Sequence, residues 1–237
     1  MTTSATAIPR PANRPESMTV DERMALLGLH RPERADDLAT GSLGRLRAIV
    51  PRQPLGLREA EGVADRQANR LRAELRVLGP AITEDDLVSL PWLTVTRREN
   101  FPTSGMATKT DYGWVIVLNS SEALVRQRFS LAHEIKHVLD DGLPEQNGGL
   151  YLSTGGYSSD ERTERVCDRF AAALLMPKVL LRADWADGLQ DIAKLAKRYH
   201  VSRAAMTVRL SQLGLIEPTP RCGVVTSAHD YRTPEAA

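Results

Sequence analysis

The stretch that most constrains this chain runs from Phe129 to Asp140 and contains the spacing HExxH. On an α-helix, His133 and His137 lie one turn apart and leave the same face, so both imidazoles can bind one metal ion. Glu134 lies about 100° round the helix axis, in the position of a general base. Lys136 is expected to point towards water, whereas the apolar residues of this stretch predict a buried side that holds the helix rigid under a cleft: Leu131, Ile135, Val138 and Leu139.

A second stretch, residues 158–177, supplies the third metal ligand. It is predicted to be a helix in which Glu164 and Asp168 share a face at i, i+4. A carboxylate completes the three protein ligands of a catalytic zinc and leaves the fourth position for water, while an acid one turn further on can orient a ligating imidazole. Alone, the two acids would indicate a solvated charged face, and HExxH alone arises by chance in about one such chain in a hundred. Together they favour a zinc site.

Composition sets the broad class. The chain has 237 residues, of which 42% are hydrophobic and 26% charged, as in a globular protein. Its 31 basic and 30 acidic residues give a net charge of +1, so no overall field indicates nucleic acid or an anionic membrane as partner. Cys167 and Cys222 make no disulfide framework, and we interpret Cys167 as a buried structural thiol. With neither a membrane-spanning run nor an N-terminal signal, we expect a cytoplasmic protein.

Three regions are predicted along the chain. Residues 1–56 form a flexible or loosely structured extension with one helix near residues 43–50, residues 57–217 form the main domain, and residues 218–237 form a tail. The main domain opens with a long amphipathic helix over residues 57–78, whose charged face is expected to be solvated.

A small sheet precedes the HExxH helix. Residues 92–97 alternate as a strand, and residues 104–109 and 113–119 form a hairpin. The HExxH helix is placed at residues 121–140, with Asn119, Ser120 and Ser121 as its cap. A substrate peptide would pair with the strand at residues 114–118 if that strand is an edge.

The loop from Gly142 to Ser159 carries Tyr151 and Tyr157 and is expected to form the rim of a cleft. These two tyrosines, with His200, are candidates for stabilising a transition-state oxyanion.

Three helices are predicted after Pro177, at residues 179–185, 189–199 and 202–213, and the last two outline a helix-turn-helix within residues 189–215. Residues 178–221 hold eight basic groups against four acids. This excess is modest, so a packing unit with solvated basic residues is favoured over DNA contact.

Four blocks together resemble the ImmA/IrrE family of zinc metallopeptidases in order and spacing: residues 113–119, 128–137, 164–177 and 196–210. The resemblance covers about residues 85–217. It implies an α+β fold, a minimal zincin-like metallopeptidase with a small β-sheet, an HExxH active helix and a C-terminal helix-turn-helix-like bundle. Members of that family often cut or inactivate helix-turn-helix transcriptional repressors, in mobile elements or in stress responses.

Carried over by position, the resemblance makes His133, His137 and Glu164 the metal ligands and Glu134 the catalytic acid/base. Asp168 falls where the family commonly has Asn, and its role beside a ligand follows from the ExxxD form. Lys136 stands where the family usually has Gly, and Cys167 where it usually has Ala; neither change removes a ligand.

We therefore predict a zinc-dependent endopeptidase that hydrolyses peptide bonds in a transcriptional repressor or another regulatory protein. Zinc is favoured over manganese or iron at a His-His-Glu site. The alternative is a DNA-binding or protein-binding regulator with a structural or vestigial metal site. An intact Glu134 argues against it, because a structural zinc needs no general base and fills its fourth position with protein.

Overall fold

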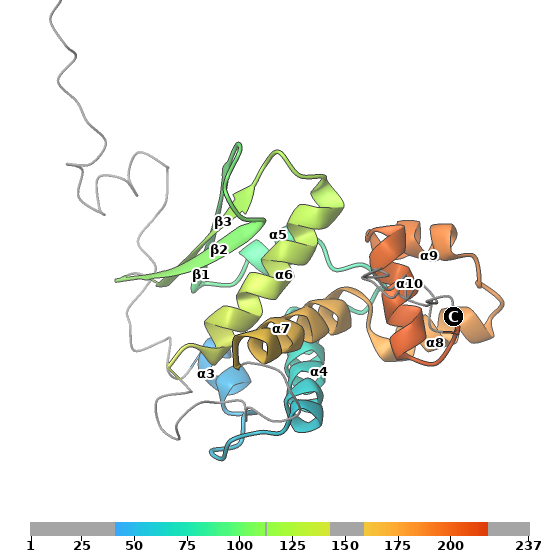
Figure 1. The fold of residues 1–237 in the computed structure, drawn as a ribbon, viewed down its shortest axis with the longest axis horizontal. Coiled ribbons are helices and arrows are strands. Elements are labelled where there is room, and N and C mark those ends of the chain that lie inside the picture. Colours follow the sequence, from blue (N-terminus) through green and yellow to red (C-terminus); the bar gives the residue numbers. More distant parts are fainter. Residues whose placement is uncertain (1–40, 112, 143–158, 218–237) are drawn as a thin grey trace, which may run out of the picture.

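The computed structural model describes residues 41–111, 113–142 and 159–217. Within these ranges the chain forms three strands and eight helices, which confirms the predicted α+β class (Figure 1). The strands are β1 (Leu93–Arg98), β2 (Gly105–Thr110) and β3 (Gly113–Asn119). The helices are α3 (Ser42–Arg47), α4 (Leu57–Glu74), α5 (Glu84–Val88), α6 (Leu124–Asp140), α7 (Ser159–Leu175), α8 (Lys178–Ala186), α9 (Ile192–Tyr199) and α10 (Arg203–Gln212).

The sheet has the strand order β1-β3-β2. Strands β2 and β3 form the predicted antiparallel hairpin, whereas β1 runs parallel to β3. Strand β3 therefore has a neighbour on each side, so the predicted pairing of a substrate with residues 114–118 is wrong. The edge strands are β1 and β2.

Gly113 allows β3 to approach the chain that enters β1. Its φ is +127°, and a Cβ atom there would lie 2.8 Å from the backbone oxygen of Trp92. The same oxygen accepts a hydrogen bond of 2.8 Å from the backbone N–H of Trp114. Only glycine fits this turn, and the contact leads into the register in which Leu93 pairs with Trp114.

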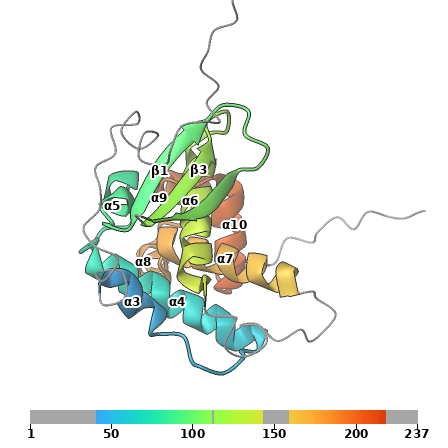
Figure 2. The same ribbon diagram turned by 90° about the vertical axis from the view of Figure 1, so that its left-hand side faces the viewer.

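Helix α6 is the central helix of the fold. It packs against β2 and β3 on one side and against α7 and α3 on the other (Figures 1 and 2). Because neighbours surround it, even Lys136 is fully buried, and its Nζ donates a hydrogen bond to Asp140 one turn on. The prediction that Lys136 points towards water is wrong, because it took α6 for a surface helix with one solvent-exposed face.

The start of α6 also differs from the prediction. The helix begins at Leu124, and its N-cap, Ala123, makes no side-chain capping bond. Asn119 and Ser121 instead hold the preceding loop: Ser121 N–H donates to Asn119 Oδ1 at 3.0 Å, and Ser121 Oγ accepts from the N–H of Asn100 at 2.9 Å.

Helices α4 and α7 pack along each other, on the side of α6 away from the sheet. Small buried side chains bring them together, including Ala60, Ala64 and Ala68 of α4 and Ala171 of α7. Two ion pairs then join their polar edges, with Arg165 Nε 3.1 Å from Glu61 and Arg169 2.6 Å from Asp65. The charged face of α4 is thus partly engaged with α7 rather than wholly solvated.

The N-terminal part of the described chain contributes to this core. Leu43 and Leu46 of α3 are buried in the same hydrophobic cluster as α4, α6 and α7. The helix predicted near residues 43–50 is confirmed as α3. The three predicted regions of the chain stay a prediction.

Helices α8, α9 and α10 form a group beyond the C-terminal end of α7 (Figure 1). Asp191 and Ser202 cap α9 and α10 by accepting hydrogen bonds from backbone N–H groups. Arg209 of α10 is buried and connects this helix to the end of α7. Its Nε donates a hydrogen bond of 3.1 Å to the backbone oxygen of Met176. Among the described residues, no helix has the length and apolar character needed to cross a membrane.

Candidate metal centre

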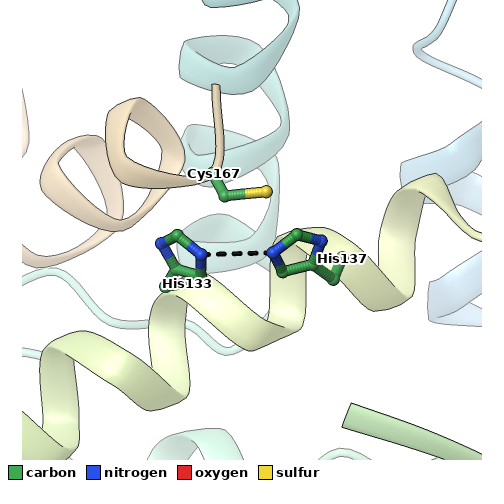
Figure 3. A group of neighbouring side chains, drawn as sticks. All are labelled: His133, His137 and Cys167. Atoms are coloured by element: carbon green, nitrogen blue, oxygen red, sulfur yellow. Dashed lines mark hydrogen bonds between the residues drawn. The ribbon is translucent and has the colours of Figure 1, made fainter. Parts of the chain in front are cut away.

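The paired imidazoles of α6 face each other, as the helical spacing predicts. The Nε2 atoms of His133 and His137 lie 3.1 Å apart (Figure 3). The side chains are 14% and 30% exposed, so both rings sit at the margin of the core. The pair can be reached from solvent and is held by buried neighbours on the same helix.

Helix α7 brings a carboxylate to both imidazoles. Glu164 places one oxygen 3.2 Å from His133 Nε2 and the other 3.4 Å from His137 Nε2. One turn on, Asp168 Oδ1 lies 2.9 Å from His133 Nδ1. A carboxylate accepts, so Nδ1 carries the proton and Nε2 of His133 keeps its lone pair for a metal ion.

Glu134 lies against the edge strand β2. A Cβ atom added to Gly105 would lie only 3.0 Å from its Cγ and 3.3 Å from its Oε1. The backbone of Ala107 also lies near the carboxylate and acts to lower its pKa. The small residues of β2 thus leave room for Glu134 between the imidazole pair and the sheet edge.

The electrostatics of the cluster follow from burial and opposite charge. For His133, burial lowers the pKa, but the hydrogen bond and charge of Asp168, with Glu164 and Glu134, outweigh it, so the net pKa is raised. For Glu134, burial raises the pKa, and the opposing effects of the two imidazoles and the Ala107 backbone are smaller.

Cys167 is the one residue of the cluster whose place was not predicted. The expectation of a buried thiol is confirmed, since the side chain is fully buried. Its sulfur and one ring nitrogen each of His133 and His137 all lie within 4.8 Å of one another (Figure 3). Burial raises the pKa of the thiol well above its ordinary value. The sequence signal was its i, i+3 spacing from Glu164, which puts both on the same side of α7.

Of the other candidates, the structure describes only His200, which is not part of this cluster. Tyr151 and Tyr157 lie outside the described residues. His200 ends α9 in a left-handed conformation, with φ 53°, and is exposed. Its backbone oxygen accepts a hydrogen bond from Arg128 of α6, and its backbone N–H donates to the backbone oxygen of Lys197 at 3.3 Å. The proposed role of these residues at an oxyanion stays a prediction.

The donor set fits a zinc ion. Tetrahedral zinc with bonds of about 2.0–2.1 Å to nitrogen and oxygen holds its ligand atoms about 3.3–3.4 Å apart. The two Nε2 atoms lie 3.1 Å apart, Glu164 Oε2 lies 3.2 Å from that of His133, and Glu164 Oε1 lies 3.4 Å from that of His137. These three residues can therefore hold zinc after shifts of a few tenths of an ångström.

A comparison with protein families identifies the family to which the chain belongs. Residues 93–211, half of its length, match the model of the M78 peptidases described as the IrrE N-terminal-like domain. The chain belongs to this family. The match spans β1 to α10 and so includes the whole candidate metal centre. The family is one of metallopeptidases, which implies a metal ion.

Two curated relatives of the IrrE family share part of the sequence. The radiation response metalloprotease IrrE of Deinococcus deserti is 36% identical over 101 residues, which are 41% of this chain and 36% of the relative. The protein of the same name from Deinococcus radiodurans is 32% identical over 102 residues, 41% of this chain and 31% of that protein. The matched segment thus spans about a third of each relative.

Among solved structures, a Mycobacterium tuberculosis transcriptional regulator aligns with a TM-score of 0.42 at 14% identity, over 72% of this chain and 51% of that one. A likeness at this level is too weak to support a conclusion about function.

Proposed function

We propose that the chain is a zinc-dependent endopeptidase. The observation that supports it most is the meeting of the His133 and His137 Nε2 atoms with both oxygens of Glu164, beside a separate carboxylate on Glu134. Three protein donors leave one position for water or substrate, as in catalytic rather than structural zinc sites. Zinc held there would supply Lewis-acid chemistry, acidifying water and polarising a peptide carbonyl.

Asp168 and Glu134 have different roles in the proposed reaction. Asp168 accepts a hydrogen bond from the Nδ1–H of His133 and so fixes the orientation of the ring, with Nε2 free to bind a metal ion. Glu134 accepts a proton from the attacking water and returns it to the leaving amine. Its carboxylate is partly buried and lies against Gly105 of β2.

Strand β2 is the surface on which we place the substrate. It is an edge strand, it pairs with β3 on one side, and its residues Gly105 and Ala107 lie near Glu134. An extended peptide that pairs with the outer edge of β2 would pass alongside the carboxylate. This replaces the central strand β3 as the expected docking strand.

The substrate is proposed to be a helix-turn-helix repressor or another regulatory protein, on the basis of the family resemblance. Co-expression with a transcription factor encoded beside this chain tests the idea directly. We expect the factor to be shortened by the wild-type protein and to keep its length with Glu134→Gln. Failure to shorten any neighbouring regulator would count against this choice of substrate.

The catalytic role of Glu134 has a sharper test with purified, zinc-loaded proteins. Glu134→Gln should lower the cleavage rate by about 10²–10⁴-fold while the zinc content and thermal stability stay unchanged. Glu99→Gln, an exposed change after β1, is the matched control and should leave the rate unchanged. Wild-type cleavage by Glu134→Gln would refute the proposed mechanism.

A regulator that binds DNA through residues 189–215 is the rival function. Of the eight basic residues in residues 178–221, three are engaged within the described part of the chain: Arg182 with Leu213 O, Arg198 with Asp184 and Arg209 with Met176 O. This favours the packing interpretation. A salt-dependent and sequence-selective shift of DNA by the purified protein would instead favour the rival.

A further inference from the structure

Helix α7 presents two different metal donors to the paired imidazoles. Glu164 reaches them from the solvent side, with 59% of its side chain exposed, whereas Cys167 approaches from the core and is fully buried. The residues are three apart, so both project towards α6. In Figure 3 the sulfur of Cys167 lies next to the gap between the two rings.

The distances put the sulfur close to bonding range. One ring nitrogen of each histidine and the sulfur of Cys167 lie within 4.8 Å of one another. Zinc bound to nitrogen at about 2.0–2.1 Å and to sulfur at about 2.3 Å would bring these atoms to about 3.5 Å. Closing the widest of these separations to that value needs a shift of up to about 1.3 Å, shared among the three side chains.

We propose that Cys167 is a fourth protein donor to the metal ion, which gives the centre a thiolate-bound state with no position open to water. This inference rests on the zinc site proposed above. Four protein donors are the arrangement of structural zinc sites, so the thiolate-bound state is a resting state. Hydrolysis requires that the sulfur leave and water take its place.

The donor chemistry also predicts metal selection. Thiolate ligands favour zinc and copper(I), whereas a site with only imidazole and carboxylate is less discriminating against manganese. Coordination by sulfur releases the thiol proton to solvent as the bond forms. Cys167 would therefore bias the centre towards zinc.

X-ray absorption at the zinc edge tests the proposal on the full-length protein loaded with one equivalent of Zn²⁺. We expect one sulfur scatterer at about 2.3 Å, together with nitrogen and oxygen at about 2.0–2.1 Å. Cys167→Ala should lose the sulfur scatterer and still bind one equivalent of zinc. Cobalt(II) gives a second readout, because its thiolate charge-transfer absorption in the near ultraviolet should vanish with the same change.

Two further variants keep the test decisive. Cys167→Ser preserves the size of the side chain if the alanine variant is unstable, and it should also lose the sulfur signal. Cys222→Ser removes the other cysteine of the chain and should retain it.

Only nitrogen and oxygen scatterers in the wild-type protein would overturn the role of Cys167 and leave the His133, His137 and Glu164 site standing. Loss of sulfur in Cys222→Ser but not in Cys167→Ala would assign the thiolate elsewhere and also overturn it. If the protein binds no zinc at all, both this inference and the proposed function fail.

Discussion

Breaking the buried ion pair between Lys136 and Asp140 from one side should strongly destabilise α6. Both residues lie on this central helix, one turn apart, with side chains only 1% and 8% exposed. Replacing Lys136 by Met keeps much of the volume and removes the cation that contacts the buried Asp140 carboxylate, on which the charge of Arg47 still acts. Breaking a buried pair from one side in this way costs about 3–5 kcal/mol.

That free energy should be visible in thermal unfolding. For a chain of this size, each kcal/mol shifts the Tm by roughly 2–4 °C, so Lys136→Met should lower the Tm by about 6–20 °C. The measurement uses metal-free protein in a chelating buffer, so that zinc affinity does not contribute. The double variant Lys136→Met with Asp140→Leu should recover most of the loss, since a well-packed apolar pair can replace a buried ion pair.

An exposed pair of the same spacing provides the control. Arg70 and Glu74 also lie at i, i+4, but the Arg70 side chain is 52% exposed. Arg70→Met should therefore cost less than about 1 kcal/mol. If Lys136→Met costs no more than this control, or if the double variant is as unstable as the single one, burial of the pair does not stabilise α6 as described.

Two other variants test the surroundings of the metal centre. Gly105→Val should push the Glu134 carboxylate away from the reacting position and lower peptide hydrolysis by at least about tenfold with zinc content unchanged. Gly79→Val is the control, because a Cβ atom there meets nothing within 4 Å, and it should leave the rate unaltered. Equal rates for the two variants would contradict the placement of Glu134 against β2. Asp168→Ala should weaken zinc binding by about 10–100-fold in a competition titration. Asp168→Asn keeps an acceptor for the Nδ1–H of His133 and should lose less zinc affinity. An unchanged affinity in Asp168→Ala would show that the ring needs no such partner.

Helical spacing, together with the ligand set that a catalytic zinc requires, predicted which side chains meet at the centre. His133 and His137 share a face of α6, and Glu164 and Asp168 share a face of α7, because residues four apart always lie one turn apart. The structure brings these four together. Their roles as ligands and positioning residue stay predictions until a metal ion is measured.

Features that depend on non-local packing could not be read from spacing. The order β1-β3-β2 is set by a crossover that places β1 beside β3, so the central position of β3 was not evident from its pattern. The burial of Lys136 depends on α3 and α7 covering a helix that local periodicity describes only as amphipathic. Cys167 was correctly expected in the core, but its approach to the imidazoles depends on how α7 crosses α6.

Anomalous diffraction at the zinc absorption edge, from crystals of the zinc-loaded protein, tests the central claim most directly. The account predicts a single strong peak with bonds of about 2.0–2.1 Å to the Nε2 atoms of His133 and His137 and to a Glu164 oxygen. A peak bound elsewhere, or a Glu164 carboxylate turned away from the ion with no other acid in its place, would contradict it.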